Sequence, residues 1–173
     1  MAEVHSGRYM AHIDGDFVVF LIGMRVNKPW RPHKWLPVAR EMGPMLKTLF
    51  AHPEKGMLGA RFGWMGGPLV VQYWRSFADL DRFARNSADP HRPAWQRFNR
   101  NVGSSGEVGI WHETYKVRSG EYECMYGNMP RVGLAAAAEH LPIGRKTDSA
   151  AQRIGAVVPE TGPEADTSEP PGG

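Results

Sequence analysis

The chain has 173 residues, 42% of them hydrophobic, a formal net charge of +3 and one cysteine, Cys124. This length fits a single domain with a core large enough to fold without disulfides, and one cysteine excludes an internal disulfide or a multi-cysteine metal site. The basic residues are scattered and no apolar run approaches the roughly 20 residues of a membrane span. We therefore expect a cytoplasmic protein with no nucleic-acid partner and no membrane partner.

The first 16 residues have no continuous apolar core and are interpreted as a polar leader. Residues 17–26 are β-branched and aromatic with few charges, which predicts a buried strand. Residues 33–50 place apolar side chains three and four positions apart, which predicts a helix. Within it, Gly43-Pro44 is expected to kink the helix or to divide it in two.

Ser76, with Asp79 three residues later, predicts the start of a second helix over 76–88, and Asp89-Pro90 predicts a further helical piece. The remaining strands are predicted from alternation of apolar and polar residues, the first two being joined by a Gly-Gly turn: 58–66, 68–74, 108–117 and, as a strand or extended edge, 122–130. The segment after 130 is expected to be weakly helical, and 145–173 to form a disordered tail.

The order β-α-β-β-α-β with an extra C-terminal strand predicts an α+β, ferredoxin-like domain over 17–144, with both helices on one face of an antiparallel sheet. The other face of that sheet is also apolar in the pattern, so it needs a cover. A homodimer in which two sheets pair face to face is the simplest cover.

Two histidines lie on different elements that are otherwise apolar on one side. His91 and Trp95 are one helical turn apart, and alternation along 108–117 places His112 on one face of its strand. Both rings are therefore expected to face the gap between helix and sheet. Either they are core histidines with hydrogen-bonding partners, or they ligate a metal or move protons.

The sequence around His112 begins like the zinc motif H-E-x-x-H, but Lys116 stands where the second histidine must be, so we reject that motif. Heme needs only one axial histidine and bulky apolar walls, which Trp95 and its aromatic and methionine neighbours would supply as readily as an ordinary core. Arg61 lies between two glycines and is a candidate for binding an anionic or oxygen-rich ligand, or else is a surface arginine. For Cys124 we expect a buried structural thiol.

The run PHRPAWQRFNRN…VGIWHETYKV…YECMYGNMPRVGLAAA resembles a family of small monooxygenase-like proteins. That family belongs to the dimeric α/β-barrel superfamily, which also contains the antibiotic-biosynthesis monooxygenases, and the resemblance covers about residues 15–142. A more distant likeness is to the heme-dependent aldoxime dehydratases. It implies heme b, with His91 as the axial ligand of the iron and His112 as the acid–base group, although those enzymes carry two such repeats and this chain has one.

Three hypotheses follow. The first is a homodimeric, heme-binding enzyme acting on a small organic substrate, a monooxygenase or a dehydratase-type lyase, with His91 and Trp95 at the cofactor and His112 and Arg61 as catalytic residues. The second keeps the fold without heme, as a cofactor-free monooxygenase in which His112 assists deprotonation of an electron-rich aromatic. The third is a dimer that binds a hydrophobic ligand and catalyses no reaction.

Overall fold

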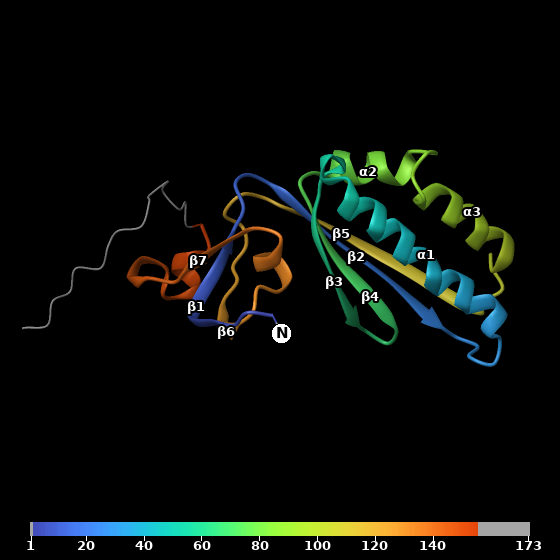
Figure 1. The fold of residues 1–173 in the computed structure, drawn as a ribbon, viewed down its shortest axis with the longest axis horizontal. Coiled ribbons are helices and arrows are strands. Elements are labelled where there is room, and N and C mark those ends of the chain that lie inside the picture. The colour runs from blue at the N-terminus through green and yellow to red at the C-terminus, as the bar shows by residue number, and fades with distance from the viewer. Residues whose placement is uncertain (1, 156–173) are drawn as a thin grey trace, which may run out of the picture.

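The structure, a computed structural model, describes residues 2–155. Its larger part is a four-stranded antiparallel sheet with helices on one face, and a smaller three-stranded sheet lies beside it (Figure 1). The strands of the larger sheet are β2 (Phe17–Val26), β3 (Met57–Trp64), β4 (Pro68–Trp74) and β5 (Val108–Val117). They are ordered β3-β4-β2-β5, so β2, the first of these strands along the chain, lies between β4 and β5. This is the ferredoxin-like arrangement, and the predicted α+β fold is confirmed.

The helical layer over this sheet contains α1 (Pro32–Ala51), α2 (Phe77–Arg85), α3 (His91–Asn101) and a short 3₁₀ turn, η1 (Pro53–Lys55). Gly43-Pro44 was expected to kink the first helix or to divide it in two, and division is wrong, because α1 continues through both Pro37 and Pro44. A proline removes one hydrogen bond of the helix, but packing of the apolar face outweighs this local cost. The face in question buries Met45, Leu46 and Leu49 against the sheet.

The predicted start of α2 is confirmed, since Ser76 Oγ accepts a hydrogen bond from the backbone N–H of Asp79, 3.1 Å away. The Asp79 carboxylate is buried and accepts hydrogen bonds from Arg75 Nε, Ser76 Oγ and Arg82 Nη1 at 3.0, 3.0 and 2.7 Å. Burial alone would raise the pKa of Asp79, but these three donors outweigh it and hold the pKa below its ordinary value of 3.8.

Replacing Asp79 by Asn is therefore expected to lower the free energy of unfolding by about 1–3 kcal/mol at neutral pH, because the buried carboxylate accepts three hydrogen bonds and a neutral amide cannot replace all of them. A carboxyl whose pKa is lower in the folded than in the unfolded state stabilises the fold above the unfolded value. That contribution is lost as the pH falls below 3.8 and through the lower pKa that Asp79 has in the folded state. Urea unfolding of the wild type and of Asp79→Asn, from neutral to acid pH, should show their free energies of unfolding converging. A difference that stays constant with pH would contradict this prediction.

The expected polar leader is corrected by the structure. Strand β1 (His5–His12) lies at the centre of the smaller sheet, between β6 (Tyr126–Met129) and β7 (Glu139–Pro142). Met10 and Ala11 of β1 are buried. Two buried apolar residues, together with pairing to β6 and β7, are enough to form a strand in an otherwise polar segment. The predicted extra strand is present as β6, but it pairs with β1 and not with the larger sheet. The predicted helical exit is a 3₁₀ turn, η2 (Gly133–Ala136), followed by β7.

The first part of the expected disordered tail has regular structure. It contains a 3₁₀ turn, η3 (Arg145–Thr147), and one turn of helix, α4 (Ala150–Arg153). The Arg153 side chain is buried and forms an ion pair with Glu123, which connects this segment to the chain just before β6. The rest of the expected tail, residues 156–173, lies outside the described residues.

Candidate functional site

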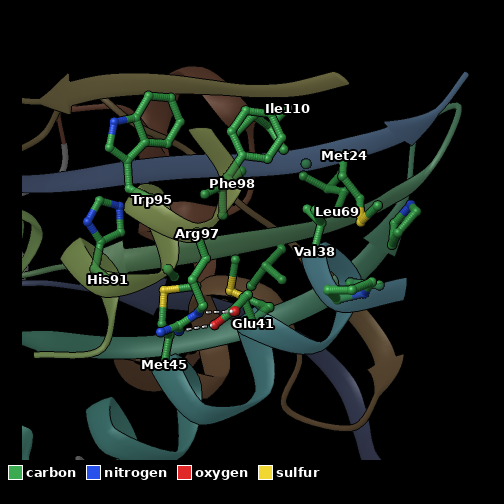
Figure 2. A pocket seen from close by; sticks show the side chains of 18 of the residues that line it. Met24, Val38, Glu41, Met45, Leu69, His91, Trp95, Arg97, Phe98 and Ile110 are labelled. Carbon is green, nitrogen blue, oxygen red and sulfur yellow. Dashed lines mark hydrogen bonds and ion pairs between the residues drawn. The ribbon is translucent and has the colours of Figure 1, made fainter. Parts of the chain in front are cut away.

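A cavity of about 180 Å³ lies between α1, α3 and the helix-facing side of the larger sheet (Figure 2). Its walls are almost entirely apolar. Met42 and Met45 come from α1, Ala94 and Phe98 from α3, and Ile22 from β2. Each helix contributes residues three or four positions apart, so the amphipathic pattern that forms the helical layer also builds the cavity.

His91, the first residue of α3, is the one imidazole in the lining of this cavity. Its ring is half-buried, and Nδ1 lies 3.0 Å from the backbone carbonyl oxygen of Ala84, at the end of α2. Because a carbonyl oxygen only accepts hydrogen bonds, Nδ1 carries the proton, and in the neutral ring Nε2 carries the lone pair. The Asp89-Pro90 turn between α2 and α3 thus places a basic nitrogen on the edge of an apolar cavity.

A second polar feature of the lining is an ion pair that joins the two helices. Arg97 of α3 donates from Nε and Nη2 to the two carboxylate oxygens of Glu41 on α1, each at 2.7 Å (Figure 2). The two charges neutralise each other in a bidentate arrangement, so the cavity carries no net charge from this pair. The cavity is therefore suited to a neutral, largely apolar molecule.

Trp95, predicted to form a wall of a binding site, does line the cavity. Its indole stacks on the ring of Phe98, with centroids 5.6 Å apart and planes inclined by 17°, and 49% of the residue is exposed. A large aromatic side chain that is half-exposed at the edge of an apolar cavity leaves room for contact with a ligand as well as with the protein.

His112 lies on the helix-facing side of the sheet, as alternation predicts. It pairs with Ile22 across β2 and β5, and its ring centroid is 5.7 Å from that of Phe20. The side chain is exposed, however, and does not belong to the lining of the cavity. The structure therefore brings His91 and Trp95 together at the cavity and leaves His112 at the surface of the edge strand.

Arg61 lies on the other face of the sheet. It pairs with Val71 across β3 and β4, one position away from the pair of Phe62 and Val70 that faces the helices. Its guanidinium Nη2 donates to the backbone oxygen of Arg131 at 2.9 Å. This contact connects β3 with the segment after β6, and it points away from the cavity.

Within residues 2–155, no three His, Cys, Asp or Glu side chains lie close enough together to hold a metal ion. Cys124 packs against a buried cluster of Ala11, Phe17, Leu134 and Ala135, and the backbone N–H of Ala11 donates to its Sγ at 3.2 Å. Burial raises the pKa of the Cys124 thiol, as expected for a thiol of structural type.

The Glu41–Arg97 pair is the feature of the site that sequence reasoning missed. The two residues are 56 positions apart, and the sequence does not show which helix faces meet. One signal was available: Glu41 lies three residues after Val38 and four before Met45, so it is an acidic residue on the apolar face of a helix. A charge in that position needs a partner.

The fold and the site together define a ferredoxin-like α+β protein with a small apolar cavity between its helices and its sheet. The family model for Monooxygenase af470-like proteins matches residues 17–134, which include the whole larger sheet and all the helices around the cavity. The chain belongs to this monooxygenase af470-like family. The monooxygenase-like resemblance is thereby confirmed, and the likeness to aldoxime dehydratases gains no support from it.

A curated relative, Monooxygenase af470 of Aspergillus fumigatus, is 26% identical over 180 residues. The match takes in 91% of this chain and 63% of that protein, so the chain spans less than two-thirds of the relative's length. Among solved structures, a dimeric ferredoxin-like protein of unknown function from Jannaschia sp. CCS1 has a TM-score of 0.40 and 15% identity, with 56% of this chain and 97% of that chain covered. A conserved protein from Methanosarcina mazei Go1 has a TM-score of 0.36 and 14% identity, with 60% and 93% covered.

None of the helices within residues 2–155 has the length and the apolar character needed to cross a bilayer.

Proposed function

We propose that the chain is a monooxygenase of a small, largely apolar organic substrate that binds in the cavity, with Nε2 of His91 as the proton acceptor. The observation that supports this most is the hydrogen bond from His91 Nδ1 to the Ala84 carbonyl, because it leaves a lone pair at the edge of an apolar cavity. The resemblance to the aldoxime dehydratases implies that His112 is the acid–base group. We propose His91 in its place, since His112 lies outside the cavity lining.

The proposed reaction requires no cofactor. Nε2 of His91 takes a proton from an activated CH₂ group of an electron-rich substrate, such as the CH₂ group in the keto form of a phenol. The resulting carbanion transfers electrons to O₂ and forms a C–OO⁻ group, which takes the first proton back from the imidazolium and becomes C–OOH. His91 then takes the second proton from that carbon, and cleavage of the O–O bond gives a C=O group and hydroxide, which leaves as water once it is protonated. The net change, CH₂ + O₂ → C=O + H₂O, balances without an external reductant. The apolar walls exclude water from the anion, and the imidazolium returns its proton to the departing hydroxide.

Heme b is a second candidate, favoured by the same hydrogen bond. A histidine that ligates a metal commonly donates its other ring N–H to a carbonyl, which fixes the orientation of the ligating nitrogen. The rest of the cavity does not fit a porphyrin. Its volume of about 180 Å³ is below the roughly 300–1,000 Å³ of pockets for drug-sized ligands, and its one arginine, available for a propionate, is already paired with Glu41.

Oxygen consumption by the purified protein tests this proposal. The assay uses a panel of small electron-rich phenols and polyketide-like aromatics, with and without added heme, and the visible spectrum is recorded in parallel. We expect the protein to take up oxygen with at least one substrate when no heme is added and its spectrum shows no Soret band. A Soret band that disappears in His91→Ala, together with activity that depends on heme, would favour the second candidate. Binding of the aromatics with no oxygen uptake under either condition would favour a ligand-binding protein.

We further propose that the chain is a homodimer in which the helix-free faces of two larger sheets meet. On that face, Leu21, Val71 and Trp111 are only half-buried in the single chain. The Trp111 indole lies over Gly23, where a Cβ would be 2.6 Å from its Cε2, so the two residues together form a flat apolar surface.

Trp111→Glu is expected to convert the dimer to a monomer at micromolar concentration, because it removes a large apolar side chain from the proposed interface and puts a charge in its place. His112→Glu is the matched control: it lies next to Trp111 on β5, but on the opposite face, and should leave the dimer intact. Sedimentation velocity measures both variants. A monomeric wild-type protein, or an unchanged dimer in Trp111→Glu, would contradict the proposed interface.

A further inference from the structure

Four large apolar side chains are exposed at the end of the larger sheet where β2 and β3 finish. Their exposed fractions are 71% for Trp30, 74% for Phe62, 78% for Trp64 and 54% for Met65. We call this set the aromatic end. Such side chains normally lose water contact in a folded protein, so a group of four at one end of a sheet indicates a surface that meets another apolar phase.

The aromatic end is formed by the β3–β4 turn and by the connection that follows β2. Register pairs Trp64 with Pro68 across the β3–β4 turn, and Gly67 in this turn packs directly against the end of β2. A Cβ at Gly67 would be 2.0 Å from the backbone oxygen of Met24. Trp30 lies in the connection from β2 to α1, and Figure 1 shows this connection and the β3–β4 turn at the same end of the sheet.

The chain around the aromatic end is basic. Residues 22–40 contain five lysines and arginines and none of the 18 acidic residues, and residues 57–75 contain no acidic residue either. Within residues 2–155, the side chains of Arg25 and Lys28 make no ion pair. Glu107, the acidic residue that reaches this end, is 4% exposed and is paired with Arg31. The surface therefore combines aromatic side chains with positive charge.

From this combination we propose that the aromatic end docks on the surface of an anionic lipid bilayer. Tryptophan side chains are enriched at the interface between lipid and water, where an apolar ring and a polar N–H are both satisfied. Lysine and arginine next to them are attracted by anionic headgroups, and stable attachment of a protein to a membrane surface generally takes two such contributions. This proposal revises the expectation of no membrane partner, which came only from the lack of a long apolar run.

A second copy of the chain fits this surface less well. Pairing two aromatic ends would bring Arg25 and Lys28 of both copies together, and like charges at an interface are unfavourable. The dimer proposed above uses the other face of the sheet, whereas Phe62 and Trp64 lie on the helix-facing side of the edge strand β3. Dimerisation through that other face would therefore leave the aromatic end exposed and free to dock.

Docking would also place the cavity beside the bilayer. Phe62 belongs both to the aromatic end and to the lining of the cavity. A small apolar substrate dissolved in the bilayer would then enter the cavity with little exposure to water. This last step rests on the proposed function, whereas the docking itself does not.

Co-sedimentation of the full chain with vesicles tests the proposal without any substrate. The vesicles contain phosphatidylcholine alone or phosphatidylcholine with phosphatidylserine. We expect at least about tenfold stronger binding to the anionic vesicles, decreasing with salt, and an about tenfold loss in Trp30→Ala/Trp64→Ala and in Lys28→Glu. Phe50→Ala is the matched control, because Phe50 is 59% exposed but lies at the far end of α1, roughly 27 Å along the helix from Pro32.

The substituted residues are at the surface, so circular dichroism and thermal melting of each variant should match the wild type. Binding that is absent, equal for both vesicle types or equally weakened by Phe50→Ala would overturn the proposal. So would a change in sedimentation velocity showing that Trp30→Ala/Trp64→Ala breaks the dimer. Vesicle binding by a protein that consumes no oxygen would support docking and at the same time count against the proposed monooxygenase.

Discussion

Replacing His91 by Gln should lower the rate of oxygen consumption by about 100-fold to 10,000-fold, the range usual for loss of a general base. Glutamine has nearly the length of histidine and keeps an N–H donor for the Ala84 carbonyl, but it has no nitrogen that accepts a proton near neutral pH. The KM should change much less than kcat, because the apolar walls that bind the substrate are untouched.

His112→Gln is the matched control for this experiment. His112 is exposed and outside the cavity lining, so its substitution should change the rate by less than about twofold, as expected for a surface residue away from the reacting atoms. A large loss in His112→Gln with little loss in His91→Gln would reverse the assignment and restore the role that the resemblance implied. Equal, small effects of both would mean that neither ring moves the proton.

Replacing Trp74 by Ala should lower the free energy of unfolding by about 3–5 kcal/mol, a large fraction of the stability of a small domain. Trp74 is 0% exposed and packs on Phe83, with ring centroids 5.9 Å apart. Its Nε1 donates to Oε1 of Gln72 at 2.9 Å, and Gln72 is itself buried, so the substitution leaves both a cavity and an unpaired amide.

Urea unfolding measures this loss, with Trp95→Ala as the comparison. Trp95 is 49% exposed, so its removal should cost less than about half as much as removal of Trp74. Similar losses for the two variants would mean that the core does not centre on Trp74 as the structure indicates.

The sequence predicted the larger sheet and its helices well, because each element carries a strong local signal. The strand at 17–26, the alternation at 108–117 and the cap at Ser76 all appear as expected. The smaller sheet could not be predicted in the same way. Strand β1 has only two buried residues, Met10 and Ala11, and it exists because β6 and β7 pair with it from more than 100 residues away.

The candidate site was predicted only in part, because local spacing shows which face of an element a residue is on but not what that face meets. The helical spacing of His91 and Trp95 placed both correctly at the cavity, since four residues along a helix define a face. Alternation placed His112 on the correct face of β5 but could not show that β5 is the edge strand, where a side chain on the helix-facing side is still exposed. The Glu41–Arg97 pair depends on how α1 and α3 meet, which is a tertiary property.

The protonation state of the two ring nitrogens of His91 tests the central claim most directly. Nitrogen-15 NMR of the protein labelled in histidine, with His91→Gln used to assign the signals, reports which nitrogen carries the proton. At a pH where the ring is neutral, we expect a protonated Nδ1, bonded to the Ala84 carbonyl, and an unprotonated Nε2 whose signal shifts when a small apolar phenol is added. A proton on Nε2, or a His91 signal unaffected by every ligand that binds the protein, would contradict the account.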